Sequence, residues 1–236
     1  MSRSTTRRLV GIVAAAGLLA GHNMNEGEVA ASTFGSWASA LTAAGAFAAF
    51  DDEADSRGVV GGIVAAGLIG YPAGMLYART ANYHVTAGDV WTLWPAGFLG
   101  ANLVAIPLVD SDVDDNTASA IVTAGFLAGI VAGDRLIVRR FDYQRGDGIL
   151  LGVGTLSGAL MGSGIYALVD REGRNDQLSS GLSAAGGILG LMVSHYYLSP
   201  VDDSDRFGEN IRFDPSGALM AAAGVPGTHP ILRLTF

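Results

Sequence analysis

The 236-residue sequence lacks cysteine and lysine and is poor in charged and aromatic residues. Without cysteine, the chain forms no disulfide, no thiolate metal site and no cysteine nucleophile. Charged residues make up only 15% of the sequence, whereas ordinary soluble domains carry about 25%. The formal net charge is −8, and no basic stripe lies beside aromatic residues. These absences argue against nucleic acid as a partner.

Small and apolar residues supply most of the sequence, which is 50% hydrophobic and contains 34 glycines. Apolar segments of about 20 residues, long enough to cross the hydrocarbon core of a bilayer, alternate with short polar segments. We therefore predict transmembrane helices. They cover residues 7–22, 29–50, 58–79, 89–109, 118–138, 148–169 and 178–198, and a shorter segment lies near 215–224.

The apolar segments belong to a longer repeating pattern. The pair Gly88 and Asp89 returns as Gly146 and Asp147, and other matches share this spacing. A unit of about 60 residues that occurs about four times predicts stacked helical hairpins. The predicted fold is an all-α membrane protein of seven to eight segments with a short C-terminal β-hairpin. The helical-hairpin membrane domain covers 1–209, with repeats near 1–56, 57–116, 117–176 and 177–236, and an extended tail or β-hairpin covers 210–236.

Small residues recur every four positions within the apolar segments. Residues four apart share one face of a helix, and rows of small residues allow two helix backbones to approach closely in lipid. The pattern therefore predicts glycine-zipper packing between helices. The predicted helix-packing residues are Gly62, Gly70, Gly74, Gly125, Gly129, Gly133, Gly154, Gly158, Gly162, Gly186 and Gly190.

The C-terminal end leaves a different fold open. Leu232, Leu234 and Phe236 alternate and end on an aromatic residue, which resembles the closing strand of bacterial outer-membrane β-barrel proteins. The alternative prediction is thus a Gly-rich outer-membrane β-barrel. Against it, the residues from Gly58 to Leu76 contain no alternating polar face that would line the inside of a barrel.

The N-terminal residues have two interpretations. Residues 1–8 are basic and 9–19 are apolar, a pattern typical of a signal peptide. The same residues also match the composition of later repeats, which predicts a first helix of the repeat domain.

Candidate chemical sites are few. Asp110, Asp112 and Asp114 alternate like the oxygen ligands of a calcium loop, but the glycine and glutamate of an EF-hand are missing. We keep these residues as a weak metal-site prediction beside a solvated acidic loop. The sequence offers no nucleophile, base and orienting group in one place, so we expect no enzyme activity and no cofactor.

Aromatic and ionisable residues gather near one end of the predicted hairpins. The pattern predicts an aromatic belt at one membrane interface, made of Tyr77, Tyr83, Trp91, Trp94, Tyr143, Tyr196 and Tyr197. Asp134 and Arg135 lie in the last turns of a predicted helix, where we expect their charges to extend to the interface. His195 is expected at the interface as well.

The sequence predicts a structural or pore-like integral membrane protein of the bacterial cell envelope, with the inner or outer membrane undecided. One alternative is a transporter or channel with a pathway between repeats, which broken helices at Pro72, Pro95 or Pro107 would support. Another is a soluble helical-repeat interaction module. The predicted partners are the lipid bilayer and a second copy of the chain.

Overall fold

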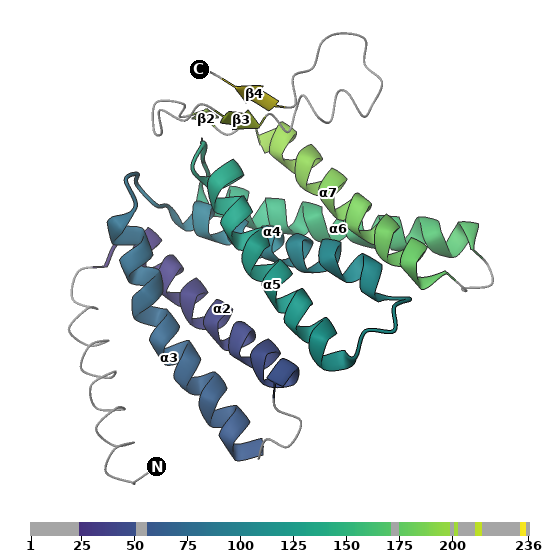
Figure 1. Ribbon diagram of the computed structural model, residues 1–236. Coiled ribbons are helices and arrows are strands. Elements are labelled where there is room, and N and C mark those ends of the chain that lie inside the picture. The colour runs from purple at the N-terminus through teal and green to yellow at the C-terminus, as the bar shows by residue number, and fades with distance from the viewer. Residues whose placement is uncertain are drawn as a thin grey trace.

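The computed structural model describes residues 24–50, 56–170, 175–198, 201–202, 211–213 and 232–234. Six α-helices lie within these residues (Figure 1): α2 (Glu26–Phe50), α3 (Ser56–Thr80), α4 (Ala87–Ala105), α5 (Asp115–Gly133), α6 (Arg145–Val169) and α7 (Asp176–Leu198). Each predicted apolar segment between 29 and 198 is helical, which confirms that part of the prediction. The segments at 7–22 and 215–224 lie outside the described residues.

The barrel alternative is wrong for the described part of the chain, because the Gly-rich segments are helices. Strands there form two short antiparallel pairs. β1 (Phe141–Asp142) pairs with β2 (Val201–Asp202), and β3 (Ile211–Phe213) pairs with β4 (Leu232–Leu234). The second pair joins the two C-terminal segments expected to be extended. The residues between β3 and β4 lie outside the described residues.

Capping side chains and irregular turns set the helix limits. Asp114 accepts a hydrogen bond from the Thr117 backbone N–H at 2.9 Å at the start of α5, which satisfies an otherwise unpaired donor. A 3₁₀ turn, Ile106–Leu108, ends α4, and a π-helical turn, Asp134–Val138, ends α5. Pro72 and Pro95 lie inside α3 and α4, which continue past them. The broken helices that would support a transporter are therefore absent at these two prolines.

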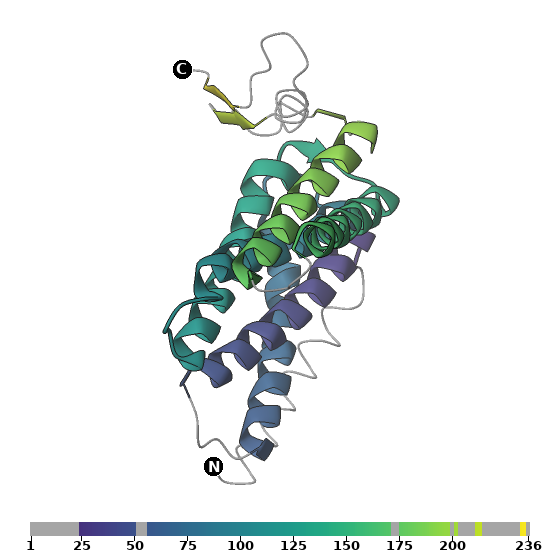
Figure 2. The ribbon, with the colours of Figure 1, turned by 90° about the vertical axis from the view of Figure 1, so that its right-hand side faces the viewer.

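The helices pack most closely as three antiparallel pairs, α2–α3, α4–α5 and α6–α7. The pairs spread like a fan: the N-terminal ends of α2, α4 and α6 converge, whereas the opposite ends diverge (Figure 1). Figure 2 shows α6 nearly end-on while α2 and α3 run along the plane of the view, so α6 is steeply inclined to the first pair. We call the converging end, where α2, α4 and α6 begin, the joint end.

Side chains are distributed with the small residues inside and many large apolar residues outside. The buried residues of α3 are all glycines, Gly67, Gly70 and Gly74. Large side chains on the same helix face outward, including Val60 and Ile69, of which 61% and 64% is exposed. Clusters of buried larger residues lie mainly at the joint end, around Val138 and Tyr143.

Among the described residues, four helices are long and apolar enough to cross a membrane. These are Ser56–Thr80, Ala87–Leu108, Asp115–Val138 and Arg145–Val169. Their length and composition make the chain compatible with a membrane location.

Candidate functional site

The joint end holds the most extensive polar contacts of the described chain. The first helix of each pair begins with a polar residue followed three residues later by an acidic residue. Thr86 and Asp89 bond each other's backbone N–H groups reciprocally, at 3.1 and 2.9 Å. This capping box satisfies two backbone donors at a helix start. Asn25 and Glu28 bond in the same reciprocal way at the start of α2. At the start of α6, the Gln144 backbone N–H donates to the Asp147 carboxylate at 3.0 Å.

Asp134 is the centre of a polar cluster that joins the first two helix pairs. Its Oδ1 accepts hydrogen bonds from the Tyr77 hydroxyl at 2.6 Å and the Tyr83 hydroxyl at 3.1 Å. Its Oδ2 accepts from Arg139 Nε at 2.8 Å. The two tyrosine oxygens lie 2.5 Å apart. The cluster therefore links α3 and the loop after it to the end of α5.

The π-helical turn places the charged partners of this cluster. The Arg139 backbone N–H donates to the Asp134 carbonyl, five residues earlier, at 3.0 Å. This wider turn brings the two side chains onto one face, where their ion pair forms. Arg135 Nε is 3.8 Å from the same carboxylate but is more exposed. Arg139 also lies over the Tyr83 ring, 5.9 Å from its centroid.

A second cluster joins the last two pairs through Tyr143. Its ring is fully buried, and its hydroxyl lies 2.7 Å from His195 Nδ1 near the end of α7. Its backbone N–H donates to Asp89 Oδ1 at 3.2 Å, and its carbonyl accepts from the Thr86 hydroxyl at 2.5 Å. Phe141 contacts the His195 ring edge-on. Tyr143 thus contacts both α4 and α7.

Burial raises the pKa of the Tyr83 and Tyr143 hydroxyls above the ordinary value, and nearby carboxylates add to the effect. For Tyr83 the carboxylate is Asp134, and for Tyr143 it is Asp89. Both hydroxyls therefore stay protonated over the physiological range. In this state each can donate a hydrogen bond, which suits a structural link.

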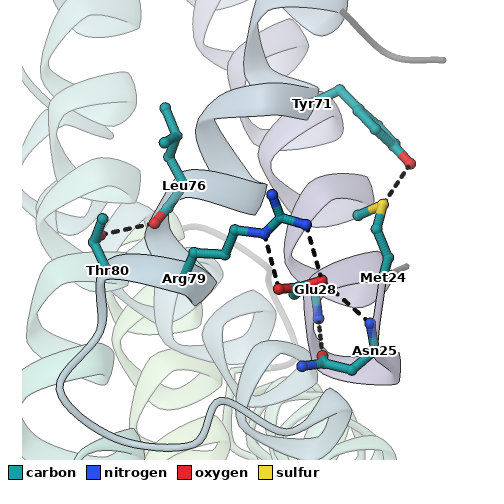
Figure 3. Close-up of polar contacts among 7 residues, drawn as sticks. All are labelled: Met24, Asn25, Glu28, Tyr71, Leu76, Arg79 and Thr80. Carbon is teal, nitrogen blue, oxygen red and sulfur yellow. Dashed lines mark hydrogen bonds and ion pairs between the residues drawn. The ribbon is translucent and has the colours of Figure 1, made fainter. Parts of the chain in front are cut away.

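An ion pair between α2 and α3 lies near the same end. Arg79 Nε donates to Glu28 Oε1 at 2.9 Å, and the two side chains point toward each other in Figure 3. Tyr71 of α3 points its hydroxyl toward the Met24 sulfur at 3.8 Å. These contacts lie within the first pair, unlike the two clusters above.

The structure corrects three predictions about this end. Tyr83 and Tyr143 are buried in polar clusters and so are not part of an exposed aromatic belt, although Trp91, Tyr196 and Tyr197 are exposed. Asp134 is also buried, and its carboxylate does not extend to solvent. Two tyrosine hydroxyls and an arginine bind this carboxylate in place of water. His195 was expected at the interface, but 5% of it is exposed.

Each of the predicted helix-packing glycines lies against another helix. A Cβ added at Gly158 would meet the carbonyl oxygen of Gly186, and one at Gly129 would meet that of Ala96. An added Cβ would meet backbone or side-chain atoms at the others as well: Gly62, Gly70, Gly74, Gly125, Gly133, Gly154, Gly162, Gly186 and Gly190. By contrast, no described residue lies within 4 Å of a Cβ added at Gly152 or Gly164.

The acidic loop before α5 offers no metal centre. Asp110 and Asp112 are exposed, and the Asp114 carboxylate is engaged by the backbone N–H and hydroxyl of Thr117, which lower its pKa. Across the described residues, no three histidine, cysteine, aspartate or glutamate side chains lie close enough to hold a metal ion. The loop thus serves as a helix start.

Grooves lie between the helix pairs. One, of about 430 Å³, lies between α2 and α4 and is lined by aromatic residues that include Trp37, Trp91 and Trp94. Another, of about 470 Å³, lies between α4, α5 and α7 and is lined by small and aliphatic residues. No family model, curated protein or solved structure matches the chain.

Proposed function

We propose that this chain is a structural integral membrane protein of the bacterial envelope, built as stacked glycine-zipper hairpins whose apolar outer surface contacts lipid. The observation that carries the proposal is the inverted side-chain distribution. On α6, Gly158 and Gly162 face α7, whereas Leu156, Leu160 and Met161 are 62%, 64% and 70% exposed. In water, such exposure would be unfavourable by about 25 cal/mol per Å² of apolar surface.

In lipid this cost of exposure disappears, because an exposed leucine then lies among hydrocarbon chains that are as apolar as its own side chain. Helices in lipid gain little from burying large apolar groups, so close backbone contact at small residues becomes a main source of association. This explains why glycines occupy the contact faces although each weakens an isolated helix in water by about 1 kcal/mol. The wholly apolar groove between α4, α5 and α7 fits lipid chains as well.

A structural role is favoured over a transport role by the joint end. The buried ionisable residues Asp134 and His195 form side-chain hydrogen bonds with tyrosines, and these bonds tie helix pairs together. A transporter would use polar groups near the middle of discontinuous helices. Here α3 and α4 run past their internal prolines without interruption.

Membrane association is tested first by fractionation. The full chain should sediment with membranes, stay there after alkaline and high-salt washes, and need detergent for extraction. In detergent its circular dichroism should be strongly helical. Recovery as a monodisperse protein in buffer without detergent would contradict the proposal.

A charge placed on the outer surface tests the environment of that surface directly. Leu156→Arg lies near the middle of α6, and Leu168→Arg lies near its C-terminal end, with both positions exposed. In a bilayer, the central arginine should cost about 2.5–3.5 kcal/mol and reduce membrane insertion, whereas the terminal one extends to the interface. If both variants insert and fold like wild type, the α6 surface faces water.

A further inference from the structure

The aromatic groove between α2 and α4 gathers every tryptophan of the chain. The sequence contains three tryptophans, Trp37, Trp91 and Trp94, and all three line this groove of about 430 Å³. Trp37 and Trp91 are 62% and 41% exposed. Phe34 of α2 contacts Trp94 of α4 edge-on, with the ring centroids 5.0 Å apart, and so joins the two walls. Tryptophan is enriched where a membrane meets water, so this gathering indicates a surface that contacts lipid at that depth.

One end of the groove carries a pair of opposite charges. Glu26 is the first residue of α2 and Arg145 is the first residue of α6, and both line the groove at the joint end. Arg145 Nη1 lies 3.6 Å from Glu26 Oε1, and the two side chains are 68% and 66% exposed. An exposed pair of this kind contributes little to stability, so both charges stay available to a ligand. Arg145 also begins one of the helices that are long enough to cross a membrane.

The groove continues from these charges along a largely apolar path. Its α2 wall runs from Glu26 past Val29 and Phe34 to Trp37. At about 1.5 Å per residue, the helix from Glu26 to Trp37 covers about 16 Å, which is about half of the roughly 30 Å hydrocarbon thickness of a bilayer. The groove therefore has the length of one leaflet, with both charges at one end and apolar surface beyond them.

We propose that this groove binds one phospholipid whose headgroup carries both a phosphate and an ammonium group. Arg145 donates hydrogen bonds to the phosphate, Glu26 accepts them from the ammonium, and an acyl chain lies along the groove as far as Trp37. A headgroup with both charges complements a groove end that carries both, whereas a purely anionic headgroup would meet Glu26 as a like charge. The inference rests on the proposed membrane location and names the class of lipid that is bound.

Tryptophan fluorescence tests the proposal, because all the tryptophans of the chain line the groove. The full chain in detergent micelles is titrated with phosphatidylethanolamine or phosphatidylglycerol that carry the same brominated chains, which quench tryptophan on contact. We expect saturable quenching at an about tenfold lower mole fraction of phosphatidylethanolamine, reversed by the unbrominated lipid with that headgroup. Unsaturable quenching that is equal for both headgroups would overturn the proposal. Absence of quenching by either lipid would also overturn it, in favour of cover by residues 1–23 or by a second copy.

Variants at the charged end of the groove test the role of each charge. Arg145→Gln should weaken phosphatidylethanolamine binding about tenfold, or by about 1.4 kcal/mol, because the phosphate loses its donor. Glu26→Gln should reverse the preference in favour of phosphatidylglycerol. Arg57→Gln, at the exposed start of α3, is the control and should bind like wild type.

Two results separate this inference from the proposed function. A detergent-extracted helical protein whose headgroup preference is the same in wild type, Arg145→Gln and Glu26→Gln would overturn the lipid site alone. Recovery of the chain in buffer without detergent would overturn the membrane location and the lipid site together.

Discussion

Within the α6–α7 pair, the two backbones meet at glycine, and a Cβ on Gly158 or Gly186 would collide with the opposite helix. Between pairs, at the joint end, glycine contacts at Gly27 and Gly88 are accompanied by hydrogen bonds from tyrosine hydroxyls, at Asp134 and His195. Close backbone packing extends along the length of a helix, and the contact is similar at each successive glycine, so it does not define one position along the helix. A hydrogen bond is directional, so it fixes one position and one angle. We infer that the glycines hold neighbouring helices close together, whereas the polar clusters fix the angles between the helix pairs.

The largest effect should come from the glycine contacts within a pair. Gly158→Leu places a side chain against the Gly186 backbone. Overpacking costs about 1–3 kcal/mol and occasionally more, and we expect a value of about 3 kcal/mol where backbone is displaced. The denaturation midpoint of the detergent-solubilised protein should fall accordingly. Gly164→Leu has no described neighbour to displace and should stay near wild type. Equal losses of stability in the two variants would show that the contact at Gly158 is no more important than the exposed position of Gly164.

The Asp134 cluster should come next. Asp134→Asn removes the negative charge and leaves a single oxygen, so either the two tyrosines or Arg139 loses its acceptor. Hydrogen bonds to a charged group are worth about 1.5–3 kcal/mol, so stability should fall by about 2 kcal/mol. Asp112→Asn, in the exposed loop, is the matched control and should unfold like wild type. Unchanged stability of Asp134→Asn would show that the cluster does not hold the pairs together.

A smaller loss is expected at the second cluster. Tyr143→Phe keeps the buried ring but removes the hydroxyl that meets His195 Nδ1. One neutral hydrogen bond contributes about 1 kcal/mol, which a denaturant titration resolves. Tyr197→Phe alters a ring that is 79% exposed and should change nothing. If the two variants lose the same stability, the contact with His195 has no special role.

Alkaline titration should give the mildest effect. Since burial raises the folded-state pKa of Tyr83 and Tyr143, their contribution to stability is complete below the unfolded value of about 10. It is lost as pH rises beyond that value. The tyrosinate absorbance of Tyr83 and Tyr143 should therefore appear late in the folded protein. Tyr83→Phe and Tyr143→Phe should each remove part of this late rise, and a normal titration of both would contradict the buried clusters.

The sequence predicted the helices well and the joints poorly. Helix limits follow from apolar length and from local signals such as Asp114 and Thr117, which lie three residues apart. The predicted packing glycines also lie on contact faces, because four-residue spacing is a local property. Partners in the polar clusters are distant in sequence, as with Tyr77 and Asp134. Residue spacing alone does not pair them.

One signal for the joints was present in the sequence. Gly88 with Asp89 and Gly146 with Asp147 recur, and in the structure both pairs lie in the first turn of a helix that begins at the joint end. The aspartates serve as capping residues. The repeat prediction used these pairs only as markers of periodicity. Their position two and three residues after an N-cap would have indicated where helix pairs join.

Solvent accessibility at Leu156 tests the central claim, that the outer surface of the helices faces lipid. A nitroxide label on Leu156→Cys in bilayer-reconstituted protein can be relaxed by oxygen, which enriches in lipid, or by a water-soluble nickel chelate. We predict strong relaxation by oxygen and weak relaxation by nickel at this position, and the reverse at Asn82→Cys in the exposed loop after α3. Equal and strong relaxation by nickel at both positions would contradict the account.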